Sequence, residues 1–230
     1  MNHSYGIINL LAVPIRSKPE HSSEMVNQLL YNEMIEILNT QGDWVYIRSK
    51  HDQYEGWLRS NQFKKISEEL FGRKAVAYIQ ELFKEDKLRY LLGTPIYTSD
   101  FQNKVLGKQF VFDLAWKLLE TPYLWGGRTP MGMDCSGFIQ ILFRFVDLEL
   151  KRDAHQQAES GIEIAWGAHK KGDLAFFINE QNKITHVGMI WSENELIHAS
   201  GKVRIDQLQK EGIFLNKKRT HILHSIRRLF

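Results

Sequence analysis

The segment PYLWGGRTPMGMDCSGF, residues 122–138, contains the only cysteine of the 230-residue chain. Cys135 stands directly before a run whose apolar side chains repeat with the spacing of one helix face: Phe138, Ile141, Leu142 and Phe145. We therefore predict that a helix begins close to Cys135 and that the thiol lies at its N-terminus. Asp134 suits the N-cap of this helix, because its carboxylate can accept hydrogen bonds from first-turn N–H groups.

A lone cysteine in this position is either core packing or a nucleophile. Free cysteine is among the most buried residue types, which favours packing. A nucleophile must instead become a thiolate, and a helix N-terminus next to an imidazolium can lower the thiol pKa from its usual value of about 8.5. If Cys135 is catalytic, the sequence therefore predicts a lowered pKa for its thiol.

Two histidines lie in a predicted hairpin, within THVGMIW (residues 185–191) and ELIHAS (residues 195–200). A catalytic base commonly needs a second polar group on its other ring nitrogen, so Cys135, His186 and His198 form a candidate nucleophile, base and orienter. The two rings can touch only if both histidines project from the same face of the hairpin. Because side chains alternate along each strand, the numbers of paired residues must then add up to an even value, which requires an odd number of loop residues. We therefore predict a three-residue loop at 192–194. A zinc site is disfavoured, because CxxC and HxxxH pairs are absent from the sequence.

The spacing of apolar residues divides the chain into regions with different patterns. Residues 1–66 contain short apolar segments separated by polar turns, at 34–38, 44–47 and 56–58, which is typical of a small β-barrel. Residues 67–108 form a connector, in which residues 75–84 are a helix or a strand pair and the turns that follow are typical of a degenerate second barrel. Residues 109–230 begin with helical periodicity and continue as strands without a β-α-β alternation, so we predict an α+β domain with a helix packed on an antiparallel sheet.

Composition excludes several classes of function. Thirty basic and twenty-seven acidic residues leave a net charge of +3, too small a surplus to indicate nucleic-acid binding. No segment approaches the ~18 apolar residues of a membrane span, and we expect neither a metal nor a cofactor. One cysteine cannot form an internal disulfide, and the first residues lack a basic leader, so we expect a cytoplasmic protein.

Four motifs in order, PYLWGGRTPMGMDCSGF, KKGDLAFF, THVGMIW and LIHAS, resemble the NlpC-type cell-wall cysteine peptidases, a papain-like family, over about residues 121–201. The segments VNQLLYNEMIEILNTQGDWVYIRS and YEGWLRSNQF resemble bacterial SH3-like domains. Together they resemble the γ-D-glutamyl-L-diamino acid endopeptidases of murein-peptide recycling. The resemblance implies an N-terminal SH3-like β-barrel followed by a papain-like catalytic domain.

The resemblance also implies roles for single residues. Cys135 would attack a peptide carbonyl, His186 would take the proton and His198 would orient His186. The backbone N–H of Cys135 and the hydroxyl of Tyr123 would stabilise the oxyanion, unless Tyr123 is only a rim aromatic. Ser136 flanks the nucleophile.

Further residues would contact the substrate. By the resemblance, Asp134 and Glu33 would bind the free α-amine of an N-terminal L-alanine, with Tyr54 a second candidate on the same wall. A solvated strand charge is the alternative for Glu33. Arg152 and Asp153, followed by Gln157, resemble a segment that lines the site, or they form a structural ion pair. Ala154 replaces a serine that is common there, so one substrate hydrogen bond is in doubt.

The leading functional hypothesis is a cysteine endopeptidase that cleaves the γ-D-glutamyl to L-diamino acid amide of free murein peptides such as L-Ala-γ-D-Glu-diaminopimelate. One alternative is an exported hydrolase that acts on the stem peptides of intact wall. The other is a peptide- or wall-binding module without activity. The preferred diamino acid, diaminopimelate or lysine, and the oligomeric state stay open at this point.

Overall fold

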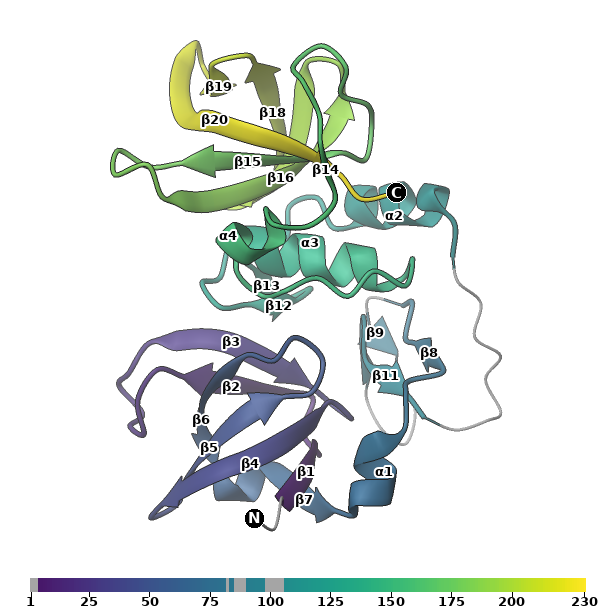
Figure 1. The fold of residues 1–230 in the computed structure, drawn as a ribbon, viewed down its shortest axis with the longest axis vertical. Coiled ribbons are helices and arrows are strands. Elements are labelled where there is room, and N and C mark those ends of the chain that lie inside the picture. The colour runs from purple at the N-terminus through teal and green to yellow at the C-terminus, as the bar shows by residue number, and fades with distance from the viewer. Residues whose placement is uncertain (1–3, 82, 85–89, 98–105) are drawn as a thin grey trace. The chain divides into compact units, whose positions relative to one another are not determined.

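The computed structural model describes residues 4–81, 83–84, 90–97 and 106–230 (Figure 1). The chain forms two compact units, of which the first comprises residues 1–105 and 125–130 and the second comprises residues 106–124 and 131–230. None of the helices in the described ranges is long and apolar enough to cross a membrane.

The first unit is built on a seven-stranded antiparallel sheet in the order β3-β2-β6-β5-β4-β1-β7. Its strands are β1 (Ser4–Ile8), β2 (Ala12–Arg16), β3 (Met25–Leu30), β4 (Met34–Gln41), β5 (Trp44–Ser49), β6 (Glu55–Arg59) and β7 (Phe63–Ile66). Buried and partly exposed side chains alternate along β2 and β5, as expected of strands with one face in a core. The three strands predicted at 34–38, 44–47 and 56–58 are confirmed as β4, β5 and β6.

The core of this sheet is aliphatic and comprises Ile8, Val13, Ile15, Leu29, Ile35, Val45, Ile47 and Leu58. Gly42 has φ of +58° in the tight connection between β4 and β5, a conformation that favours glycine. Among the described strands no pairing joins β3 to β7. The first unit therefore contains an SH3-type sheet, and the closed barrel predicted here is not formed by these pairings.

Shorter elements complete the first unit: η1 (Ser60–Gln62), α1 (Glu68–Gly72), β8 (Ala77–Tyr78), β9 (Phe83–Lys84), β10 (Tyr90–Leu91), β11 (Pro95–Ile96) and β12 (Arg128–Thr129). β8 pairs with β11, and β9 pairs with β10. Residues 82, 85–89 and 98–105 of the predicted connector lie outside the described residues.

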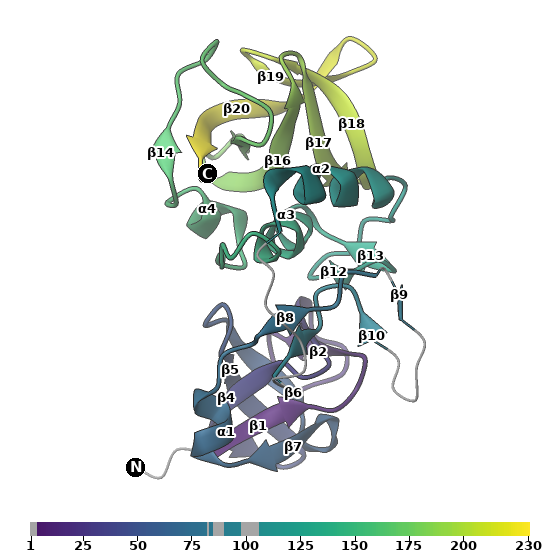
Figure 2. The same ribbon diagram turned by 90° about the vertical axis from the view of Figure 1, so that its right-hand side faces the viewer.

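The second unit combines three helices with a closed antiparallel barrel. Its elements are α2 (Lys108–Lys117), β13 (Gly132–Met133), α3 (Cys135–Arg144), α4 (Ala154–Gln157), β14 (Ile162–Glu163), β15 (Leu174–Ile178), β16 (Ile184–Ser192), β17 (Glu195–Ser200), β18 (Lys202–Gln209), β19 (Gly212–Leu215) and β20 (Lys218–Arg228). Strands β15 to β20 are paired in succession, a pairing of β20 with β15 completes the ring, and β14 pairs with the outer end of β20. Figure 2 shows the three helices gathered at one side of this barrel.

The prediction of a helix packed on an antiparallel sheet holds for α3, which packs on β16 and β17. It was wrong about the shape of the sheet, which closes on itself, so the barrel of this chain lies in the C-terminal unit. The reason is β20, whose eleven residues pair with β19 near one end and with β15 near the other. The chain as described is mostly β, with few helices, which is a poorer fit to a balanced α+β class.

Candidate active site

Cys135 is the first residue of α3, as predicted, and it is buried. The carboxylate of Asp134 accepts a hydrogen bond from the N–H of Gly137 at 2.7 Å and thereby caps the helix. The Cys135 Sγ lies 4.0 Å from the carbonyl oxygen of Thr185 and interacts with the N–H of Val187. These two residues flank His186 in β16, so the thiol lies beside the stretch of strand that carries the predicted base.

The thiol of Cys135 does not have the lowered pKa that its helix position predicted. Burial raises the pKa to about 12, and the negative charge of Asp134 adds to the rise. The N–H of Val187 and the charge of Arg152 oppose this change without overcoming it. Because desolvation outweighs the helix N-terminus, the resting sulfur is a thiol and needs a proton acceptor at the moment of attack.

The two predicted histidines meet in a hydrogen-bonded row with a third group. His186 Nε2 lies 2.7 Å from His198 Nδ1, and the ring planes are at 83°. His198 Nε2 lies 3.1 Å from Asp206 Oδ2, which also accepts from Arg204 Nε at 2.9 Å. His186, His198 and Asp206 are all buried.

The negative charge of Asp206 determines which ring nitrogens of His198 and His186 carry a proton. Burial raises the pKa of Asp206, but the hydrogen bond and charge of His198 and the charge of Arg204 outweigh it and leave that pKa lowered. Burial lowers the pKa of both histidines, so both rings are neutral near pH 7. An ionised Asp206 accepts from His198 Nε2–H, and His198 Nδ1 then accepts from His186 Nε2–H. The basic nitrogen of His186 is therefore Nδ1.

The rings share a face because of a bulge that the sequence did not reveal. Ile190 pairs with Leu196, an even sum that confirms the predicted parity. The register then shifts, so that Ser192 pairs with Glu195 and the loop is only two residues long. The predicted three-residue loop was wrong, because the extra residue, Trp191, lies inside β16 as a β-bulge and restores the parity.

The sequence analysis did not identify Asp206, although strand alternation could have indicated its role. His198 pairs with Arg204 in the next hairpin, and residues two apart in a strand share a face. Extending the strand alternation through KVRIDQL, residues 202–208, would have placed Asp206 on the face of His198.

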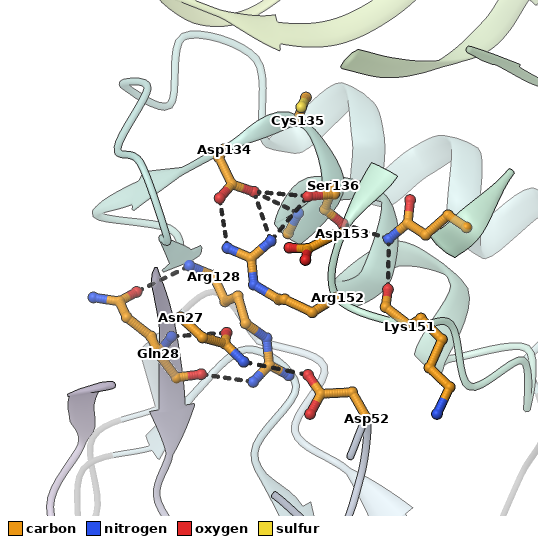
Figure 3. Close-up of polar contacts among 12 residues, drawn as sticks. Asn27, Gln28, Asp52, Arg128, Asp134, Cys135, Ser136, Lys151, Arg152 and Asp153 are labelled. Atoms are coloured by element: carbon orange, nitrogen blue, oxygen red, sulfur yellow. Dashed lines mark hydrogen bonds and ion pairs between the residues drawn. The ribbon is translucent and has the colours of Figure 1, made fainter. Parts of the chain in front are cut away.

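Asp134 and Arg152 form a buried ion pair beside the nucleophile (Figure 3). Arg152 Nη1 donates to Asp134 Oδ1 at 3.0 Å and to Ser136 Oγ at 2.9 Å, and its Nη2 donates to Asp134 Oδ2. Arg152 is thus ion-paired with Asp134, next to the nucleophile. Asp153 forms a capping box with Gln156 at the start of α4.

Gln157 links the same turn to the nucleophile. Its Nε2 donates to the carbonyl oxygens of Ser136 at 3.0 Å and Lys151 at 2.9 Å. Tyr123 is half-buried, and its pKa is raised by burial and by the nearby Cys135 and Asp134. The Tyr123 side chain therefore lies within electrostatic range of the thiol, as its predicted role requires.

Glu33 and Tyr54 belong to the first unit. Glu33 is 2 % exposed and forms a two-pronged ion pair with Arg128, whose Nη1 and Nη2 each lie 3.0 Å from a carboxylate oxygen. The alternative of a solvated charge is therefore wrong for Glu33. Figure 3 shows Arg128 also bound to Gln28, and the N–H of Tyr54 donates to Asp52 Oδ1 at 3.1 Å. Arg128 was not singled out in the sequence.

The described part of the chain contains no cluster of histidine, cysteine and acidic side chains that could hold a metal ion. The arrangement in the second unit instead provides a buried thiol beside the strand that carries His186, and a polar row that fixes the tautomer of that neutral imidazole. This set can perform nucleophilic acyl transfer, with His186 as general base.

Comparison with known proteins agrees with this chemistry. Residues 120–222 match the NlpC/P60 family, and residues 15–63 match the bacterial dipeptidyl-peptidase SH3 domain. The chain is 28 % identical over 210 residues to a γ-D-glutamyl-L-lysine dipeptidyl-peptidase of Bacillus subtilis, which covers 75 % of this chain and 71 % of the relative. It is 23 % identical to dipeptidyl-peptidase 6 of Lysinibacillus sphaericus, over 90 % of this chain and 92 % of the relative.

The fold has a close counterpart among solved structures. A crystal structure of an NlpC/P60 family protein from Bacillus cereus superposes with a TM-score of 0.78, covers 98 % of this chain and 99 % of its own, and is 17 % identical. At this identity the match shows the fold, and the two sequence matches supply the family. The protein is therefore an NlpC/P60 cysteine peptidase with an N-terminal bacterial SH3 domain.

Proposed function

We propose that the enzyme hydrolyses the amide between a γ-D-glutamyl residue and an L-diamino acid, and that it releases an N-terminal dipeptide from a peptide with a free amino end. The observation that carries the reaction type is the 2.7 Å contact of His186 with His198, in a strand whose neighbouring residue Thr185 lies 4.0 Å from the Cys135 thiol. The substrate class is supported by the relatives, which are named γ-D-glutamyl-L-lysine dipeptidyl-peptidases in two Bacillus species.

The site suggests the following course of reaction. Cys135 Sγ attacks the γ-glutamyl carbonyl carbon while its proton passes to His186 Nδ1. The resulting imidazolium is stabilised through His198 by the charge of Asp206, and the oxyanion by the N–H of Cys135 and by Tyr123. His186 then protonates the leaving amine of the diamino acid. Water, deprotonated by His186, hydrolyses the thioester and restores the thiol.

The preference for a free amino end rests on the relatives' names and not on free carboxylates. Asp134 and Glu33 were predicted to bind the substrate ammonium together. Each is paired with an arginine inside its own unit, so the net charge of each pair is zero. We keep the free-amine requirement because a dipeptidyl-peptidase by definition counts from the amino end.

Two further parts of the proposal concern the setting of the enzyme. A cytoplasmic location is supported by the single cysteine, which leaves the fold independent of disulfides. A division into residues 1–66, 67–108 and 109–230 is supported by the change from short strands to the helix that precedes the peptidase motifs.

The test compares L-Ala-γ-D-Glu-L-Lys, its diaminopimelate counterpart and the N-acetyl form of each, with products identified by mass spectrometry. We expect release of L-Ala-γ-D-Glu from the free peptides and a kcat/KM at least about a hundredfold lower for the acetylated ones, which corresponds to ~2.7 kcal/mol. The Cys135→Ala variant is the control for contaminating activity. Equal rates on both forms would favour the hydrolase of intact wall, and no turnover of either would favour the binding module.

A further inference from the structure

A third histidine lies against the proposed base and has no part in the mechanism above. His221, in β20, is partly buried, and its ring centroid lies 4.3 Å from that of His186 with the two planes inclined by 30°. Its Nδ1 lies 2.9 Å from Thr220 Oγ1. The two imidazoles are therefore in close contact at a moderate tilt, and the hydrogen bond of His221 is made outside the row of His186, His198 and Asp206.

We propose that His221 is a positioning residue, whose ring covers one face of His186 and holds that base in the orientation in which Nε2 reaches His198. The inference rests on the proposed function only in taking His186 as the base. The strand order supports it, because β15 pairs with both β16 and β20, and Phe177 of β15 pairs with His186. Phe177 and His221 are thus neighbours around the same ring.

The His186 ring needs such support, because the χ2 torsion of histidine has a broad, two-fold energy profile. A half-turn would exchange Nδ1 for a carbon and would remove Nε2 from His198. The contact with His198 opposes this turn at one edge of the ring. The adjacent ring of His221 opposes tilting out of the plane, which a single hydrogen bond does not prevent.

The surroundings of His221 keep its imidazole uncharged near neutral pH. The titratable and charged groups near the paired rings are His198 on β17 and Arg204 and Asp206 on β18. Burial, followed by the charges of His198 and Arg204, lowers the pKa of His221 to about 4, with Asp206 acting in the opposite direction. Below that pH a protonated His221 would oppose the proton that His186 must accept.

The test uses His221→Phe, which keeps a flat ring but cannot titrate, and His221→Ala, which removes the ring. We expect His221→Ala to lose about ten- to a hundredfold in kcat at pH 7 with little change in KM, a part of the 10²–10⁴ that a general base contributes. His221→Phe should restore kcat to within about threefold, and its kcat/KM should fall less steeply below pH 5 than that of the wild type. His224→Ala, in the same strand and exposed, is the matched control.

A second readout separates this inference from the substrate assignment. Alkylation of Cys135 by iodoacetamide at pH 7 needs a proton acceptor but no substrate, so it should be slowed in His221→Ala and normal in His221→Phe even if the wild type does not cleave γ-D-glutamyl peptides. A wild-type kcat in His221→Ala, or a His221→Phe variant as slow as His221→Ala, would overturn the positioning role. If His221→Ala fails to fold, the His221→Phe variant decides the question through its kcat at pH 7 and the fall of its kcat/KM below pH 5.

Discussion

Asp206 should control the tautomer of the proposed base, His186, to which it is linked by two hydrogen bonds through His198. Its Oδ2 accepts from both His198 Nε2, at 3.1 Å, and Arg204 Nε, at 2.9 Å. Asp206→Asn can place its amide oxygen at the Oδ2 position and satisfy both donors. Asp206→Ala removes the acceptor, so His198 is free to carry its proton on Nδ1, and His186 must then accept at Nε2 and lose its basic Nδ1.

The size of the effect follows from the burial of the partners. His198 is 0 % exposed and cannot exchange the carboxylate for bulk water, whereas the Arg204 side chain is 23 % exposed and can be solvated. A hydrogen bond to a charged group contributes ~1.5–3 kcal/mol, and about 1.4 kcal/mol corresponds to a factor of ten. We therefore expect kcat/KM of Asp206→Ala to fall by about 10- to 150-fold and that of Asp206→Asn by less than about tenfold.

The assay is steady-state hydrolysis of L-Ala-γ-D-Glu-L-Lys between pH 5 and 9, with thermal unfolding of each variant as a control for folding. Nitrogen-15 NMR of labelled histidines reports the tautomers directly and should show His186 protonated at Nε2 in the wild type and in Asp206→Asn. Equal losses in the two variants, or a fully active Asp206→Ala with unchanged tautomers, would refute the reasoning.

Two further predictions concern the nucleophile and the first unit. Because the pKa of the Cys135 thiol is raised to about 12, the ultraviolet difference spectrum between the wild type and Cys135→Ala should show no thiolate from pH 6 to 9; a thiolate signal from pH 6 onward would show a thiolate-imidazolium pair instead. Glu33→Ala removes the two-pronged partner of the buried Arg128, while the charge of Asp52 stays nearby, and should lower the free energy of unfolding in urea by up to ~3–5 kcal/mol. Glu36→Ala removes one partner of the partly exposed Arg48 and should lower the free energy of unfolding far less, because exposed ion pairs contribute little; similar losses in both variants would contradict the buried pair.

The residues that the sequence identified are those whose signals are local. The apolar period after Cys135 fixed the start of α3, and the Asp134 cap followed from the capping chemistry of its side chain. The parity rule gave the condition for His186 and His198 to share a face, an even sum of paired residue numbers, and the register of Ile190 with Leu196 meets it. The loop itself was misjudged, since a bulge changes the count of residues without changing the local pattern.

Other parts of the site depend on contacts between distant segments and on burial, which a local pattern does not contain. The long strand β20 closes the barrel and brings His221 to His186, and neither result can be read from the β20 sequence alone. The thiol pKa was predicted in the wrong direction, because the cost of desolvation depends on everything packed around Cys135 and exceeds the effect of one helix end. The sequence by itself thus determined that a helix begins at Cys135, and it predicted Cys135, His186 and His198 as nucleophile, base and orienter from spacing and from the family resemblance. Only the tertiary structure decided which arginine neutralises which carboxylate, that Asp206 completes the row, and that the barrel is C-terminal, because strand register and solvent exclusion are properties of the whole fold.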